Sequence, residues 1–107
     1  MIFHVVPAPE WGAGPGPYAP ASLASEGFVH CSADRASALE VANAHYAHYP
    51  RCADAPGPLL LLGIDEARLD AEVRWEGAFP HVYGPVGREA VVEAAELRRD
   101  GGRWVAP

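Results

Sequence analysis

The stretch from Leu59 to Ile64 is the longest apolar run in the chain, and it limits the possible folds more than any other segment. Its sequence, Leu-Leu-Leu-Leu-Gly-Ile, shows no alternation of apolar and polar residues, which predicts a central β-strand buried on both faces. A run of this length cannot cross a bilayer, because a membrane-spanning helix needs about 20 residues. We therefore expect a water-soluble domain built around a sheet.

The length and the remaining segments predict a single α+β domain over residues 1–107. Short β-branched and aromatic segments predict further strands. They lie at residues 2–6, 28–31, 73–75, 79–83, 91–97 and 103–105, and a short helix is an open alternative for 91–97. The Gly- and Pro-rich segment from Gly12 to Pro20 predicts a surface loop. In all, we expect about six strands and one main helix.

The main helix is predicted from about Ala33 to Tyr49, and Pro50 disfavours its continuation. Its expected buried face, at helical spacing, consists of Ala36, Leu39, Ala42 or Asn43, Tyr46 and Tyr49. Ser32 stands where an N-cap residue belongs. The helix N-terminus would then direct free backbone N–H groups toward His30 and Ser32, which predicts a local site for a phosphate or another anion.

The charged residues limit the partners of the chain. With a formal net charge of −6 and eight thinly spread arginines, the chain has no basic surface, so we expect neither a nucleic-acid nor a membrane partner. Lysine is absent, which excludes a Schiff-base enzyme, a lysine-bound pyridoxal cofactor and a Walker A loop. The segment Met1 to Val6 lacks the features of a signal peptide, so we expect a cytoplasmic protein.

The cysteines predict no metal centre. Cys31 and Cys52 do not form a CxxC pair, and two thiols cannot complete a zinc site without histidines. We expect both to be reduced thiols. A zinc site formed by His30, His81 and Cys31 is an alternative that no ligand spacing supports.

Two short segments place polar side chains in apolar surroundings: Gly27-Phe28-Val29-His30-Cys31-Ser32 and Phe79-Pro80-His81-Val82-Tyr83-Gly84. Each sets a histidine beside a hydroxyl residue, as at a strand end that delivers polar groups to the wall of a cleft. If these strand ends meet, His30 and His81 are candidates for acid and base, because histidine titrates near neutral pH. Glu76 is the carboxylate nearest to this cluster in sequence, although a hydrogen bond to a loop is an equally open role for it.

These segments resemble a bacterial family known as domain of unknown function 952. The resemblance extends to Leu59–Asp65, Leu69, Trp75-Glu76 and Pro85, and it covers nearly the whole chain, including Trp11. It implies a fold similar to the ADP-ribosyltransferase superfamily, whose members bind NAD in a cleft between two small antiparallel sheets. In that superfamily a His-x-Ser or His-x-Thr pattern contacts the ribose and nicotinamide of NAD, and His30-Cys31-Ser32 matches it loosely. The late catalytic glutamate of the superfamily has no clear match.

The resemblance implies a small-molecule-binding protein that acts on NAD or on an ADP-ribose- or nucleoside-like ligand. In this reading His30 and Ser32 hold a ribose, Tyr83 stacks on or hydrogen-bonds the base, and Phe79 and Trp11 line the pocket. The same residues would also suit a cofactor-independent isomerase, dehydratase or cyclase that works by acid–base chemistry. A ligand sensor without catalysis is a further alternative.

Overall fold

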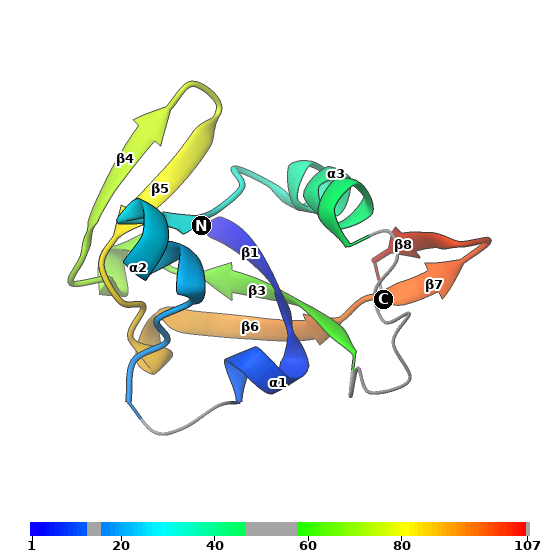
Figure 1. The fold of residues 1–107 in the computed structure, drawn as a ribbon, viewed down its shortest axis with the longest axis horizontal. Coiled ribbons are helices and arrows are strands. Elements are labelled where there is room, and N and C mark those ends of the chain that lie inside the picture. The colour runs from blue at the N-terminus through cyan, green and yellow to red at the C-terminus, as the bar shows by residue number, and fades with distance from the viewer. Residues whose placement is uncertain (13–15, 47–57, 107) are drawn as a thin grey trace.

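The computed structural model describes residues 1–12, 16–46 and 58–106 of the chain. At the centre of its first sheet is β3 (Leu59–Ile64), which lies between β1 (Ile2–Pro7) and β6 (Val91–Glu96) in antiparallel pairings (Figure 1). All six residues of β3 are buried. The predicted central strand buried on both faces is confirmed. Residues 91–96 form a strand, so the helical alternative for this segment is wrong.

A second antiparallel sheet has β5 (Phe79–Tyr83) at its centre, between β2 (Val29–His30) and β4 (Glu72–Glu76). The hairpin of β4 and β5 stands away from the first sheet (Figure 1). The two sheets are joined where the backbones of Phe3 and Ser32 exchange hydrogen bonds of 2.9 and 2.7 Å. This bridge sets the edge strand β1 beside the end of β2.

Short helical segments connect the strands. They are α1 (Ala8–Trp11), α2 (Ala21–Glu26) and the 3₁₀ turns η1 (Glu66–Arg68) and η2 (Arg88–Ala90). Helix α2 ends at Gly27, whose φ of 87° is a left-handed conformation that glycine adopts without strain.

The main helix, α3 (Arg35–His45), begins two residues later than predicted. Its N-cap is Asp34, whose carboxylate accepts a hydrogen bond of 2.7 Å from the N–H of Ser37. The prediction that Ser32 caps the helix is wrong, because the backbone of Ser32 is extended and paired with Phe3. Tyr49 and Pro50, which were expected to end the helix, lie outside the described residues.

One face of α3 packs against the first sheet, as helical spacing predicts. Ala42 is buried there, and Leu39 and Tyr46 pack around it. Ala36 is exposed, and Ala38 is buried in its place. Both residues are alanines, so the hydrophobic pattern could not choose between them.

A C-terminal hairpin of β7 (Arg98–Asp100) and β8 (Arg103–Val105) completes the fold. Asn43 of α3 holds it by accepting from the N–H of Trp104 at 2.8 Å and donating to its C=O at 3.1 Å. The indole Nε1 of Trp104 donates to the C=O of Tyr46 at 2.8 Å. The described chain is thus an α+β fold of small antiparallel sheets with few helices, and none of these helices is long and apolar enough to cross a membrane.

Side chains of β3 enter two buried clusters, because successive residues of a strand point to opposite faces. Leu60, Leu62 and Ile64 belong to a cluster that includes residues of the second sheet. Leu59 and Leu61 belong to a cluster that includes residues of α3. The central strand therefore supports both the second sheet and the helix, the two parts that surround the candidate site.

Candidate functional site

One face of the second sheet carries the polar residues that the sequence singled out. On β5, Phe79, His81 and Tyr83 share this face, while the two intervening residues are buried on the other. The strand register brings His30 opposite His81, and Glu76 opposite Phe79. The condition that the sequence left open, that the two site segments meet, is therefore fulfilled.

His30 and His81 lie side by side because of their position in the antiparallel ladder. The next residue, Cys31, donates its N–H to the C=O of Pro80 at 3.1 Å, so the histidine pair occupies a position without mutual backbone hydrogen bonds. Side chains approach most closely at such positions. The centroids of the two imidazole rings are 5.4 Å apart, and the ring planes meet at 71°.

Each histidine lies beside its own carboxylate. His30 Nε2 donates to Glu26 Oε2 at 2.7 Å, and because a carboxylate can only accept, this contact leaves Nδ1 as the acceptor of a neutral ring. His81 Nδ1 lies 3.1 Å from Glu76 Oε2, which is within ion-pair distance. The angle of that contact falls outside hydrogen-bond geometry, so this buried nitrogen has no hydrogen-bond partner among the described residues. Each carboxylate can orient its imidazole, which suits acid–base chemistry.

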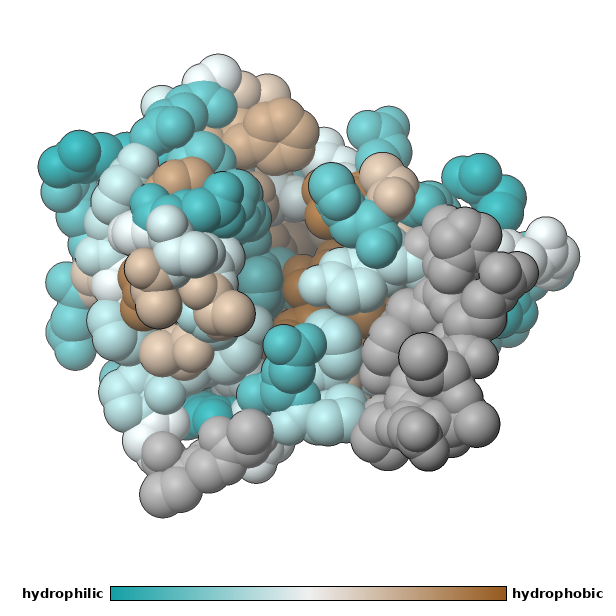
Figure 2. All heavy atoms as spheres, viewed as in Figure 1, coloured by the Kyte–Doolittle hydropathy of each residue, from teal (hydrophilic) through white to brown (hydrophobic). Residues whose placement is uncertain are grey.

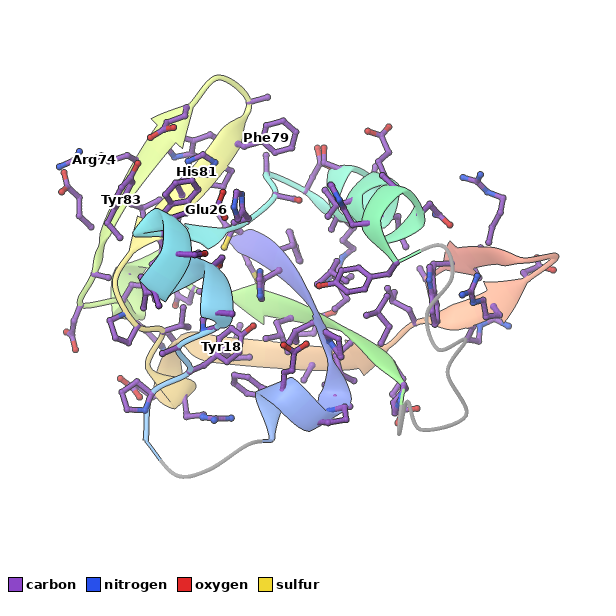
Figure 3. The ribbon with its side chains drawn as sticks, viewed as in Figure 1. Tyr18, Glu26, Arg74, Phe79, His81 and Tyr83 are labelled. Atoms are coloured by element: carbon purple, nitrogen blue, oxygen red, sulfur yellow. The ribbon has the colours of Figure 1, made fainter. Side chains whose placement is uncertain are left out.

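Tyr83 forms a hydrogen bond with Glu76 that lowers the pKa of the carboxylate. Its hydroxyl donates to Glu76 Oε1, and this hydrogen bond is the main cause that lowers the pKa of Glu76, with a smaller contribution from His81. The same bond raises the pKa of Tyr83. The guanidinium of Arg74 lies over the Tyr83 ring, 4.8 Å from its centroid (Figure 3). Glu76 is therefore held in its ionised form beside His81.

Phe28 contacts three of these rings, although the sequence did not single it out for the site. It stacks on His81 with the centroids 4.1 Å apart and the planes at 15°. Its centroid is 4.7 Å from that of His30 and 5.4 Å from that of Tyr83. Phe28 stands two residues before His30, and this same-face spacing in a strand was the available signal.

A cavity of about 570 Å³ lies between β1, the second sheet and α3, and we call it the inter-sheet cavity. His30, His81, Phe79 and Ser32 form one wall of it. Figure 2 shows a hollow with an apolar floor between the α2 and α3 sides of the molecule, and Figure 3 shows Phe79 pointing from β5 toward α3. The volume falls in the range of about 300–1,000 Å³ that is typical of small-molecule sites.

The predicted ligand-binding residues divide between this cavity and other places. Ser32, with 4% of its surface exposed, and Phe79 line the cavity. Tyr83 and Glu76 do not line it; Tyr83 donates to Glu76, which lies beside the lining residue His81. Trp11 does not line it; the indole packs edge-on against Tyr18 with the centroids 5.6 Å apart, and Arg88 covers it at 4.3 Å. Trp11 thus packs against Tyr18, which lines the cavity.

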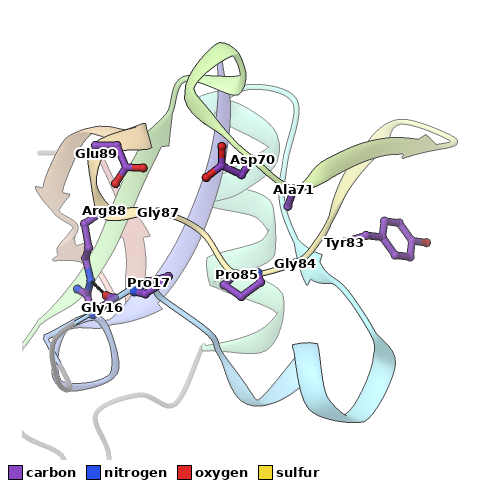
Figure 4. A pocket seen from close by; sticks show the side chains of 10 residues that line it. All are labelled: Gly16, Pro17, Asp70, Ala71, Tyr83, Gly84, Pro85, Gly87, Arg88 and Glu89. Carbon is purple, nitrogen blue, oxygen red and sulfur yellow. Dashed lines mark hydrogen bonds between the residues drawn. The ribbon is translucent and has the colours of Figure 1, made fainter.

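A second cavity of about 570 Å³ lies beside the loop that follows β5 (Figure 4). Tyr83 stands at its rim, and Asp70, Arg88 and Glu89 contribute its charged groups. The described residues that line it include no histidine. For this reason we place the candidate site in the inter-sheet cavity.

His4 and Tyr18 add a hydrogen-bonded pair to the inter-sheet cavity. His4 Nδ1 donates to the C=O of His30 at 2.6 Å, and His4 Nε2 accepts from the Tyr18 hydroxyl at 2.9 Å. Burial lowers the pKa of His4 from 6.5 to about 4, against the opposing effect of its hydrogen bond to the backbone of His30. His4 interrupts an otherwise apolar strand, and that interruption was the signal in the sequence.

His4 should make the fold sensitive to mild acid. Between pH 6.5 and about 4 the unfolded chain binds a proton at this histidine that the folded chain does not, so stability must fall as the pH falls. We expect the free energy of unfolding to decrease through this window by at most about 3 kcal/mol. Denaturant unfolding at several pH values in the window measures it. His4→Phe should flatten this part of the profile, and an unchanged slope would contradict the assignment.

Two further expectations concern capped or buried groups. The anion site predicted at the N-terminus of α3 stays a prediction; the Asp34 carboxylate accepts from the N–H of Ser37 in that turn and would compete with an anion there. Burial raises the pKa of the Cys31 thiol to about 12, which makes it a poor nucleophile. Cys52 lies outside the described residues. Within the described ranges, no three His, Cys, Asp or Glu side chains are grouped so as to hold a metal ion.

Comparison with known proteins relates this chain to two crystal structures of protein CC0527 from Caulobacter crescentus. The structure of CC0527 itself has a TM-score of 0.69 and 28% sequence identity, and the similarity covers 97% of this chain and 92% of that one. The structure of a double mutant of CC0527 has a TM-score of 0.68 and 27% identity over the same shares. Comparison with curated proteins gives no match.

A family profile matches the sequence itself. It is that of the family described as "Protein of unknown function (DUF952)", and it matches residues 5–94. The matched range contains both site segments and most of the inter-sheet cavity. The chain therefore belongs to the DUF952 family of proteins of unknown function.

Proposed function

We propose that the chain binds a small molecule in the inter-sheet cavity and acts on it by acid–base chemistry at His81 and His30. One observation carries this proposal: two histidines on neighbouring strands line the same cavity, and each lies beside its own carboxylate. In such a pair one ring can take a proton from an attacking hydroxyl or water, while the other donates a proton to the leaving group. Glu76 and Glu26 would stabilise the imidazolium that forms.

For the ligand we propose NAD or an ADP-ribose- or nucleoside-like molecule. The likeness to the ADP-ribosyltransferase fold is part of this proposal, and a cavity between two small antiparallel sheets supports it. The described residues that line the cavity include no arginine, so a pyrophosphate would lack a cationic partner there. We therefore assign the cavity to the part of such a ligand that carries no phosphate, a nucleoside or the nicotinamide riboside half.

The same absence of arginine from the described lining favours a second candidate function. A cofactor-independent isomerase, dehydratase or cyclase for a small neutral metabolite needs only the two histidine–carboxylate pairs and an apolar wall. Such an enzyme would not respond to NAD. A ligand sensor would bind its ligand in the same cavity without turnover.

Titration of the isotope-labelled protein with NAD, ADP-ribose, nicotinamide and adenosine tests the ligand class. We expect saturable NMR shifts of the amides around His30 and His81. Nicotinamide release from NAD would then establish glycosidic cleavage, whereas binding without product formation would point to a sensor. If no ligand at millimolar concentration shifts these amides, any affinity is weaker than about 4 kcal/mol, and the second candidate gains support.

Phe79 should contribute to affinity rather than to stability. Its ring lines the cavity while 46% of the residue is exposed, so Phe79→Ala should weaken binding of an aromatic ligand about fivefold to tenfold without unfolding the chain. The matched control is Trp75→Ala on the same hairpin, where 52% of the residue is exposed and the side chain faces away from the site. Isothermal titration of both variants measures the difference. Equal losses in the two variants would remove Phe79 from the binding site.

A further inference from the structure

The hydrogen bonds of His4 have a fixed direction. A backbone carbonyl can only accept, so the 2.6 Å contact with the C=O of His30 requires a proton on His4 Nδ1. In a neutral imidazole the other nitrogen then carries no proton, and Nε2 can only accept. The 2.9 Å contact between Nε2 and the Tyr18 hydroxyl is therefore a hydrogen bond donated by Tyr18.

His4 and Tyr18 both keep these protonation states at neutral pH. Burial lowers the pKa of His4 to about 4, so the imidazole remains neutral. Burial also raises the pKa of Tyr18, so its hydroxyl keeps its proton. That single proton is directed at His4, and the Tyr18 oxygen can offer a ligand only its lone pairs.

The Tyr18 ring is fixed in place. Its backbone exchanges hydrogen bonds of 2.7 and 2.8 Å with Val86, its ring packs against Trp11, and only 5% of the residue is exposed. Tyr18 and His4 both line the inter-sheet cavity, together with His30 and His81. A hydroxyl in this position cannot turn to suit the ligand, in contrast to an ordinary surface hydroxyl.

We propose that Tyr18 is a specificity-determining residue whose oxygen selects ligands that present an N–H or O–H donor to it. This inference rests on the proposed function, because it concerns the same cavity. A ligand that places a carbonyl or ether oxygen at Tyr18 would face an acceptor and leave it unpaired, which costs affinity. The ligand class is thereby narrowed to molecules with an amino, amide or hydroxyl donor at the end that meets Tyr18.

Two pairs of probes of nearly equal shape test this selection. Nicotinamide carries an amide NH₂ where 3-acetylpyridine carries a methyl group, and adenosine carries an amino group that purine riboside lacks. Wild-type protein should bind the donor member of at least one pair about fivefold more tightly. Tyr18→Phe should abolish that preference by weakening the donor ligand alone, while binding of the other member stays unchanged.

The proton positions are tested without any ligand. The ¹⁵N chemical shifts of the His4 ring in the free protein should show a protonated Nδ1 and an unprotonated Nε2, and a proton on Nε2 would overturn the inference. Donor preference that persists in Tyr18→Phe, or its absence from both pairs in wild-type protein that binds them, would also overturn it. If wild-type protein binds none of the four probes at millimolar concentration, the proposed nucleoside- or nicotinamide-like ligand class itself fails, and the selection by Tyr18 fails with it.

Discussion

Replacing His81 with alanine should lower the turnover of the ligand by about 10²- to 10⁴-fold. The imidazole lines the inter-sheet cavity, where it lies beside Glu76, stacks on Phe28 and meets His30 edge-on. The free energy of unfolding should change by no more than about 1.5 kcal/mol, because the lost ring contacts with Phe28 and His30 lie outside the two buried clusters of the core. Single-turnover kinetics and denaturant unfolding of the same preparation measure both effects.

His81→Gln separates proton transfer from packing. Glutamine keeps polar atoms and much of the volume but cannot titrate, so this variant should bind ligand nearly as wild type while losing turnover as His81→Ala does. If His81→Ala instead unfolds the protein by several kcal/mol, the histidine is a structural residue. Turnover that survives both substitutions would exclude His81 as an acid or base.

The strands could be predicted where a local pattern decides them. The apolar run of β3 and the Pro- and Gly-bounded segment of β5 match the predicted ranges 59–64 and 79–83 residue for residue. Strand β2 could not be bounded in this way, because its pairing with β5 and the bridge from Ser32 to Phe3 are set by contacts between distant segments. Because this bridge pairs Ser32 with Phe3, the N-cap of the helix is Asp34 and not Ser32.

The candidate site was also predictable only in part, because some of its contacts depend on the fold and not on a local sequence pattern. His30 and His81 are visible in the sequence because each is a polar residue in a short apolar segment. Glu26 is a solvent-exposed residue of α2 with nothing local to distinguish it, and it reaches His30 only because Gly27 turns the chain. His4 and Tyr18 come together across 14 residues that include a loop, and sequence spacing says nothing about such a contact.

The position of the histidine pair depends on the buried face of the second sheet, because the strand register decides which residues lie on each face. Val29 and Val82 are opposite one another and fully buried, and the next pair along the ladder is His30 and His81 on the outer face. A shift of one residue would exchange these faces and bury the histidines. The apolar residues therefore fix the histidine pair in place, through a cluster that extends to Leu62 of β3.

Leu62→Ala and Leu61→Ala should each lower the free energy of unfolding by about 2–5 kcal/mol. Both side chains are buried in the central strand, with 0% and 1% of the residue exposed, and each truncation leaves a cavity in a different cluster. A domain of this size is typically stable by about 5–15 kcal/mol, so either loss is a large share of the total. Val92→Ala on the neighbouring strand β6, where 48% of the residue is exposed, is the control and should cost less than about 0.5 kcal/mol.

The two leucine variants should differ in what they do to the site. Leu62 packs in the cluster that includes Val29 and Val82, so its truncation should loosen the second sheet and weaken ligand binding before the chain unfolds. Leu61 packs with Ala38, Ala42 and Trp104, so its truncation should first loosen α3 and the C-terminal hairpin. Hydrogen exchange of the native state distinguishes these outcomes residue by residue. If Leu62→Ala leaves the amides of His30 and His81 as protected as in Leu61→Ala, the β3 cluster does not hold the histidine pair in place.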